Sequence, residues 1–149
     1  MKRLVEQTLG DMADQIEESG FGIRYQCNTE HTKFMGDGNR MYRVVQNVIE
    51  NALKYSLKGT RIFIYITEEA GNIVLKVTNT ASYEMNFTEE EIMERFARAE
   101  KSRTSEGNGL GLSIADSFTK NCGGKFEIKI EGDQFTVTIQ FKQYFKENK

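Results

Sequence analysis

The segment from Gly107 to Leu112 places a glycine at every second position, immediately before a run of residues with helical spacing. Glycine adopts positive φ without steric cost and lets the backbone approach a ligand closely. Leu110, Ile114 and Phe118 recur at intervals of four, and this periodicity predicts a helix over residues 110–121. The free N–H groups and the positive dipole end at the start of such a helix suit a phosphate. The segment is therefore typical either of a phosphate-binding loop or of a flexible turn before an ordinary helix.

A second segment, residues 38–57, combines two stripes on one predicted helix. Apolar residues with helical spacing predict its buried stripe: Met41, Val44, Val45, Val48, Ala52 and Tyr55. Asn47, Asn51 and Lys54 fall at i, i+4 and i+7, so they share another stripe. Asparagine is a poor helix former because its side chain competes for backbone hydrogen bonds. Two interpretations stay open: a solvated polar face, or two amide oxygens and a cation directed at Mg²⁺ and a polyphosphate, since Mg²⁺ takes few protein ligands.

The composition is that of one domain spanning residues 1–149, because a chain of this length can bury a hydrophobic core. Twenty basic residues against twenty-two acidic residues leave a formal charge of −2, which argues against a nucleic-acid or anionic-membrane surface. No apolar run approaches the roughly 20 residues that a bilayer-spanning helix needs. Cys27 and Cys122 lack the spacing of a metal site, and the simplest interpretation is a reduced, cytoplasmic setting.

Hydrophobic periodicity and turn residues predict helices and strands along the whole chain. Helices are expected over 4–19, 38–57, 89–96 and 110–121, and strands over 21–27, 61–67, 72–79, 125–130 and 134–141. Thr88 is the expected cap of the short helix that begins at residue 89. The charged segment 97–108 has few apolar anchors and ends next to glycine, so it is predicted to be a mobile lid.

Four segments resemble, in order, the motifs of sensor histidine kinases. Residues 47–56 resemble the N box, residues 94–98 the F box, and residues 107–112 the second glycine box. Residues 122–125 resemble the turn after the lid helix, which in the family usually reads His-Gly-Gly and here reads Cys-Gly-Gly. Each motif is short, but four in the same order form a specific resemblance.

The match in order and spacing runs from about Leu4 to Phe141. Type II topoisomerase ATPases, Hsp90-like chaperones, MutL-like proteins and anti-sigma kinases share the fold, whereas the ending Lys54-Tyr55-Ser56 and the pair Phe96/Arg98 favour the histidine kinase branch. The resemblance implies an α+β fold of the Bergerat type. It is a two-layer α/β sandwich with a mixed, mostly antiparallel sheet of about five strands packed on three helices, and with a mobile ATP lid.

The resemblance also implies the function of an ATP-binding catalytic domain. Such a domain transfers the γ-phosphoryl group of Mg-ATP to a histidine on a separate dimerisation domain of the same full-length protein, which is expected to be a homodimer. The further expected partner is the receiver domain of a response regulator, and no nucleic acid or membrane contact is expected of this chain. The expected location is the cytoplasm, with the full-length protein anchored in the membrane.

The predicted catalytic set is Asn51, Lys54 and Arg98. Asn51 is the expected Mg²⁺ ligand, with Asn47 one turn away as helper, and Lys54 is expected to contact phosphate as a point charge. Arg98 is expected to stabilise charge on the transferring phosphoryl group, although basic residues in an exposed loop are usually solvated. Tyr55 is expected beside the base or ribose, or alternatively in the core stripe. The complete predicted nucleotide site comprises Asn47, Asn51, Lys54, Tyr55, Asn79, Phe96, Arg98, Lys101, Arg103, Gly107, Gly109, Leu110, Gly111 and Leu112.

One segment departs from the family's pattern. The first glycine box usually reads Asp-x-Gly-x-Gly, whereas residues 79–83 read Asn-Thr-Ala-Ser-Tyr. The Asn79 amide oxygen can accept a hydrogen bond from the adenine amino group, but without the charge assistance of a carboxylate. Adenine recognition is therefore expected to be weakened. The alternative is that Asn79 only caps the end of a strand and that nucleotide binding is lost.

The sequence contains no residue that matches the family's phosphate acceptor. Its single histidine, His31, is followed by Thr32 rather than by an acidic residue, so His31 is expected on the surface. The chain is interpreted as a catalytic fragment separated from the sensor, transmembrane and acceptor portions. Two other functions stay open: a degenerate nucleotide-binding regulatory module, and an ATPase that uses a glutamate near the N box. Glu50 precedes Asn51 but points about 100° away around the helix.

Overall fold

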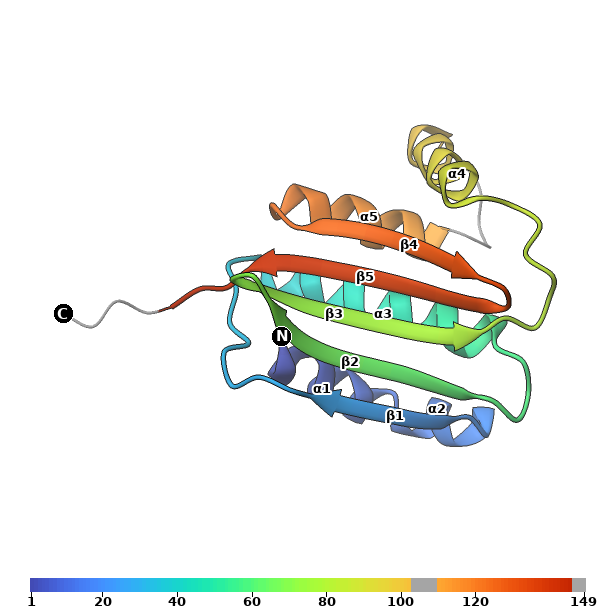
Figure 1. The fold of residues 1–149 in the computed structure, drawn as a ribbon, viewed down its shortest axis with the longest axis horizontal. Helices are drawn as coiled ribbons and strands as arrows, with labels where there is room; N and C mark the ends of the chain where they lie inside the picture. Colours follow the sequence, from blue (N-terminus) through green and yellow to red (C-terminus); the bar gives the residue numbers. More distant parts are fainter. Residues whose placement is uncertain (103–109, 146–149) are drawn as a thin grey trace.

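The computed structural model describes residues 1–102 and 110–145 (Figure 1). Its helices are α1 (Lys2–Asp11), α2 (Ala13–Ser19), α3 (Gly38–Tyr55), α4 (Glu89–Ser102) and α5 (Leu110–Asn121). Its strands are β1 (Gly22–Cys27), β2 (Arg61–Glu69), β3 (Asn72–Thr80), β4 (Lys125–Glu131) and β5 (Gln134–Lys142). Within this described part, no helix has the length and the hydropathy needed to cross a membrane.

The strands form one sheet in the order β1-β2-β3-β5-β4. β1 pairs with β2 in parallel, whereas β2–β3, β3–β5 and β4–β5 are antiparallel pairs. α1, α3 and α5 lie on one face of the sheet, and the described helices leave the opposite face open (Figure 1). The predicted α+β sandwich, with a mixed and mostly antiparallel sheet of five strands, is confirmed.

Alternating burial along the strands creates the core between the two layers. Ile62, Ile64 and Ile66 of β2 are fully buried, whereas Tyr65 faces the open side, because successive side chains of a strand point to opposite faces. The buried residues of α3 are Met41, Val44, Val45, Val48, Ile49 and Ala52. This is the predicted stripe with Ile49 added, and Tyr55 at its end is only half-buried.

The N-terminal helix differs from its prediction. The single helix expected over 4–19 is divided into α1 and α2 at Met12, which has φ −99° and ψ 9°. The Thr8 hydroxyl donates a hydrogen bond to the carbonyl oxygen of Leu4, a type of bond that often bends helices. Gly10 adds a poor helix former to the same turn. The break allows Met12 to enter the core, where it is 4% exposed.

The prediction for the segment after residue 96 was wrong in part. The short helix expected over 89–96 continues as α4 to Ser102. The helix continues because residues 97–101 have high helix propensity: they are two alanines, an arginine, a glutamate and a lysine. The mobile lid predicted over 97–108 therefore begins inside a helix, and its residues 103–108 lie outside the described part of the chain.

A glycine pair forms the turn from α5 into β4, and its two members are required for different reasons. Gly123 has φ +85°, a left-handed conformation that side chains disfavour. A Cβ atom added at Gly124 would lie 2.6–2.8 Å from ring atoms of Phe141. Phe141 is 3% exposed, and its ring centroid is 4.4 Å from that of Phe34. The first glycine therefore supplies backbone conformation, and the second supplies space.

Candidate functional site

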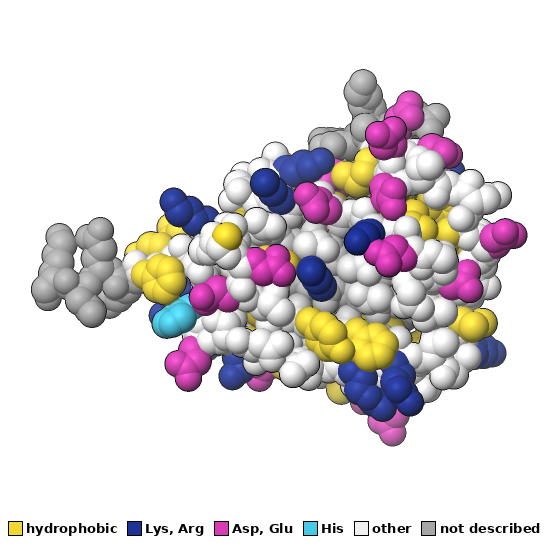
Figure 2. Space-filling view, in the orientation of Figure 1, with side chains coloured by type: hydrophobic (Ala, Val, Ile, Leu, Met, Phe, Trp, Pro, Cys, Tyr) yellow, Lys and Arg dark blue, Asp and Glu magenta, His cyan; other side chains and the backbone are white. Residues whose placement is uncertain are grey.

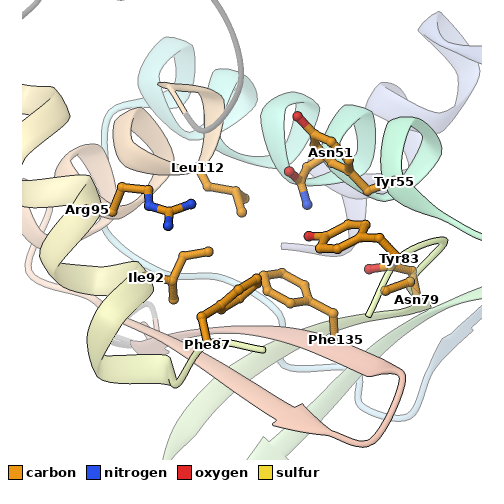
Figure 3. Close-up of a pocket in the computed structure, with 10 residues that line it drawn as sticks. Asn51, Tyr55, Asn79, Tyr83, Phe87, Ile92, Arg95, Leu112 and Phe135 are labelled. Carbon is orange, nitrogen blue, oxygen red and sulfur yellow. The ribbon is translucent and has the colours of Figure 1, made fainter. Parts of the chain in front are cut away.

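One pocket opens between α3, α4, α5 and the neighbouring ends of β3 and β5 (Figure 3). Its walls consist of Asn51, Tyr55, Asn79, Ala81, Tyr83, Phe87, Ile92, Arg95, Leu112 and Phe135. Asn51, Tyr55, Asn79 and Leu112 belong to the nucleotide site predicted from the sequence. The fold thus brings together residues from three segments that are far apart in the chain.

The wall formed by α3 contains Asn51 and Tyr55, which lie one turn apart. The amide group of Asn51 points into the pocket (Figure 3). Lys54, which was predicted beside them, is not part of the pocket wall. Its Nζ atom lies 5.5 Å from the centre of the Tyr55 ring, a distance at which a cation is attracted to the ring face. Lys54 therefore lies next to the site, beside a residue that lines it.

Asn47 lies one turn before Asn51, where α3 packs against α5. A Cβ atom added at Gly111 would lie 3.8 Å from the Asn47 Cβ, so the glycine lets the first turn of α5 come close to this side chain. The Nδ2 atom of Asn47 is buried and has no hydrogen-bond partner within the described residues. Leaving such a donor unpaired costs about 1–3 kcal/mol. An acceptor supplied by a bound ligand or water would remove this cost.

The amide oxygens of Asn51 and of the neighbouring Asn47 are ligands of the kind that hard cations such as Mg²⁺ accept. The described residues contain no group of three or more His, Cys, Asp or Glu side chains that could hold a metal ion. A cation here would depend on the amide oxygens of Asn51 and Asn47 and on oxygens of a ligand. Mg²⁺ is commonly bound in this way, because it keeps phosphates and waters among its six ligands. The assignment of both residues to Mg²⁺ stays a prediction.

Asn79 lies near the end of β3 and is 3% exposed. The chain after it is tied to both neighbouring elements: Ala81 N–H donates to the Asp133 carbonyl at 2.7 Å, and Ser82 N–H donates to the Tyr55 carbonyl at 2.8 Å. These bonds hold the end of β3 against the C-terminal end of α3. Asn79 therefore lies both near the end of β3 and in the pocket wall.

The sequence analysis missed the other six wall residues, which are Ala81, Tyr83, Phe87, Ile92, Arg95 and Phe135. The available signal for Tyr83 and Phe87 was the occurrence of two aromatic residues four positions apart in a mostly polar segment. Ile92 and Arg95 are three positions apart on α4 and therefore share a helix face. The Arg95 guanidinium points into the pocket (Figure 3).

The surroundings of Tyr83 in the pocket favour its neutral form. Burial raises the pKa of the Tyr83 hydroxyl, and the neighbouring Tyr55 raises it further, whereas Arg95 lowers it. The net effect is a raised pKa, so the Tyr83 hydroxyl stays protonated at neutral pH and can donate a hydrogen bond. Because the described wall residues include Arg95 but no carboxylate, the pocket suits an anionic ligand.

The start of α4 is both capped and attached to the sheet. The Thr88 hydroxyl accepts a hydrogen bond from Glu91 N–H at 3.1 Å, which confirms Thr88 as the predicted cap. The Glu89 Oε1 atom accepts from the N–H of Ile130 at 2.9 Å. Ile130 belongs to β4, which is an edge strand. This bond joins the helix that contains Arg95 to the sheet.

Replacing Glu89 with alanine is expected to accelerate hydrogen exchange at the Ile130 amide about fivefold, because a hydrogen bond of roughly 1 kcal/mol is lost. Amide exchange measured by NMR tests this. The control is Glu90→Ala, which removes an exposed carboxylate from the same turn of α4 and should leave exchange at Ile130 unchanged. Equal exchange rates in Glu89→Ala and the unmodified protein would contradict the attachment.

Several predicted site residues fall outside what the structure describes. Phe96, Arg98 and Lys101 belong to α4, but their side chains are not among the described ones. Leu110 begins α5 as predicted, again without a described side chain. Arg103, Gly107 and Gly109 lie outside the described residues altogether. The roles assigned to these residues stay predictions.

Known proteins show similarity to this chain in sequence. The family model described as "Histidine kinase-, DNA gyrase B-, and HSP90-like ATPase" matches residues 36–143. Sensor protein GtcS of Aneurinibacillus migulanus is 32% identical over 99 residues, which cover 66% of this chain and 27% of GtcS. Sensor-like histidine kinase SenX3 of Mycolicibacterium smegmatis is 31% identical over 112 residues, which cover 72% of this chain and 29% of SenX3. The chain thus spans little more than a quarter of the length of these relatives.

Solved structures show the same fold. The catalytic domain of histidine kinase ThkA has a TM-score of 0.79 at 18% identity, covering 96% of this chain and 92% of that one. Acinetobacter baumannii histidine kinase AdeS has a TM-score of 0.71 at 20% identity, covering 97% of this chain and 65% of that one. At these identities the likeness concerns the fold alone, and it agrees with the predicted two-layer sandwich.

Proposed function

Because the chain belongs to the family of histidine kinase-, DNA gyrase B- and HSP90-like ATPases, we propose that it is the ATP-binding catalytic domain of a sensor histidine kinase. The observation that carries this proposal is the single pocket whose walls contain Asn51, Asn79 and Leu112. Asn51 and Leu112 come from the segments that resemble the N box and the second glycine box, and Asn79 comes from the segment in the place of the first glycine box. Three motifs that are separate in sequence therefore supply one site.

In the proposed complex, the base lies at the Asn79 end of the pocket beside Tyr55, and the phosphates extend toward α5. The N–H groups at the start of α5 donate to phosphate oxygens there. Asn51 and Asn47 supply amide oxygens to Mg²⁺, which when bound neutralises charge on the phosphates. Arg95 adds a guanidinium, the group best suited to bind a phosphate through two hydrogen bonds.

We favour transfer of a phosphoryl group over hydrolysis of ATP as the reaction of this site. Hydrolysis needs a base that activates water, and Glu50, next to Asn51 on α3, stays the candidate for that base if the chain is an ATPase. Transfer between two bound groups instead depends on positioning and charge neutralisation, which amide and guanidinium groups supply.

The proposed acceptor is a histidine on the dimerisation domain of the full-length protein, which acts as a homodimer and passes the phosphoryl group to a response regulator receiver domain. His31 is exposed and does not line the pocket. The centroid of its ring lies 5.3 Å from that of the Phe145 ring. In this proposal, a separate domain supplies the acceptor. In the proposed setting this domain lies in the cytoplasm, and the full-length protein is anchored in the membrane.

Two measurements test the proposed function. Calorimetric titration with Mg-ATP, Mg-ADP and Mg-GTP should show nucleotide binding, and labelled γ-phosphate should be transferred to the histidine of the added dimerisation domain. Binding without transfer would favour a regulatory module that acts through conformation. Failure to bind any of the three nucleotides would overturn the proposal.

Replacing Asn79 with aspartate is expected to tighten ATP binding by a few-fold to tenfold, because a charged acceptor is worth roughly 1 kcal/mol more than a neutral one. GTP binding should not improve, since guanine presents a carbonyl where adenine presents an amino group. The buried carboxylate should also lower the free energy of unfolding in the absence of nucleotide. Calorimetry with both nucleotides measures the selectivity, and unchanged affinities would show that Asn79 does not contact the base.

A further inference from the structure

Tyr83 is the most exposed aromatic residue of the pocket wall. It is 43% exposed although it lines the pocket, so a large part of its ring is available to a ligand. Figure 3 shows the ring between α3 and the rings of Phe87 and Phe135, with the hydroxyl directed toward the centre of the pocket. The ring exists here because residues 79–83 depart from the glycine-containing pattern described above.

The position of this ring is supported from two sides. The Tyr55 ring meets it nearly edge-on, with centroids 6.0 Å apart and planes at 77°. The Phe87 ring lies 6.4 Å away with its plane at 32°. The residue before it, Ser82, is fixed by its hydrogen bond to Tyr55. Such pairs restrict the ring, and an ordered aromatic face loses little entropy when a flat ligand packs against it.

The other groups at this end of the pocket offer little hydrogen bonding. Ala81, Phe87 and Phe135 are apolar, and Asn79 is neutral. A neutral amide contributes about 1 kcal/mol to binding, whereas stacking of a base on an aromatic side chain contributes about 1–3 kcal/mol. The balance between these two contributions favours the aromatic contact.

We propose that Tyr83 is the main base-binding residue of the nucleotide site, and that it holds the base by stacking rather than leaving its binding to a hydrogen bond accepted by Asn79. This inference rests on the proposed function. Every base has an aromatic face, so stacking discriminates poorly between adenine and guanine. The unmodified protein should therefore bind Mg-ATP and Mg-GTP with similar affinity.

The test compares nucleotides with a ligand that has no base. Calorimetry is performed with Mg-ATP, Mg-GTP and Mg-triphosphate on the unmodified protein, Tyr83→Ala and Tyr83→Phe. Tyr83→Ala should weaken binding of both nucleotides by about 5- to 150-fold and in the same proportion, and should leave binding of triphosphate unchanged. Tyr83→Phe should retain nucleotide affinity, because the aromatic face remains. Tyr144→Ala, which removes a tyrosine of similar exposure (46%) outside the pocket, is the matched control.

Other results would overturn the inference. Equal weakening for triphosphate would show that Tyr83 only maintains the shape of the pocket. Tighter nucleotide binding by Tyr83→Ala would show that the ring obstructs the base. If the protein prefers one nucleotide and loses this preference only in Asn79 variants, the Asn79 amide recognises the base. If the unmodified protein binds neither nucleotide nor triphosphate, the proposed function itself fails, which is a distinguishable outcome.

Discussion

Replacing Asn51 with alanine is expected to remove Mg²⁺-dependent nucleotide binding, with a loss of affinity of at least about 100-fold. Changing groups that merely support a metal ligand already costs about 10- to 100-fold, so loss of a ligand should cost no less. The fold should survive, because Asn51 is half-buried at the pocket wall and alanine is the better helix former. Calorimetry with ATP, with and without Mg²⁺, together with urea unfolding of the variant, measures both effects.

The matched control is Asn121→Ala, which removes an exposed asparagine from the last turn of α5. It should bind Mg-ATP like the unmodified protein. A second comparison is the affinity for ATP in the presence of a chelator, which should be the same for Asn51→Ala and its parent. If Asn51→Ala instead keeps the Mg²⁺ dependence of its parent, Asn51 is not a metal ligand and the placement of the phosphates is wrong.

The largest effect on stability is expected for Gly124→Ala, which should lower the free energy of unfolding by about 1–3 kcal/mol, as overpacking of a buried site does. The added methyl group would lie 2.6–2.8 Å from the ring of Phe141, so the ring has to move. Phe34 packs on that ring and resists the movement. Urea unfolding at equilibrium measures the change.

A glycine elsewhere in the same protein provides a control of opposite sign. A Cβ atom added at Gly10 of α1 meets no atom within 4 Å, and this helical position does not require positive φ. Gly10→Ala should therefore raise the free energy of unfolding by about 0.5–1 kcal/mol. If Gly124→Ala changes the free energy of unfolding as little as Gly10→Ala does, the Phe141 ring moves easily and the turn tolerates a side chain.

The elements with strong periodicity could be predicted from the sequence, and those governed by competing local effects could not. The stripe on α3 and the alternation on β2 are regular because each element buries a single face. The break at Met12 depends on a side-chain hydrogen bond from Thr8, which apolar spacing does not reveal. The extension of α4 to Ser102 follows from helix propensity, which was outweighed in the prediction by the charged character of the segment.

Within the candidate site, the residues that the sequence revealed lie on regular elements, although Ile92 and Arg95 of α4 and Phe135 of β5 were missed. Asn51 and Leu112 are on helices, and Asn79 is on a strand, so their neighbours could be inferred from motif order. Tyr83 and Phe87 lie between β3 and α4, where no period applies. Their place in the pocket is decided by backbone hydrogen bonds between distant segments, such as the one from Ser82 to Tyr55. Contacts of this kind arise only in the folded chain.

The order of the strands affects how easily the chain between β3 and β5 can change in length during evolution. β3 pairs with β5, and the chain between Thr80 and Gln134, which includes α4, α5 and β4, is a single excursion that closes on this pair. The entropy of closing an excursion grows only with the logarithm of its length, so doubling it costs about 0.6 kcal/mol. Insertions in this excursion should therefore cost little folding free energy. The chain between the two paired strands is thus free to vary in length at almost constant stability of the sheet.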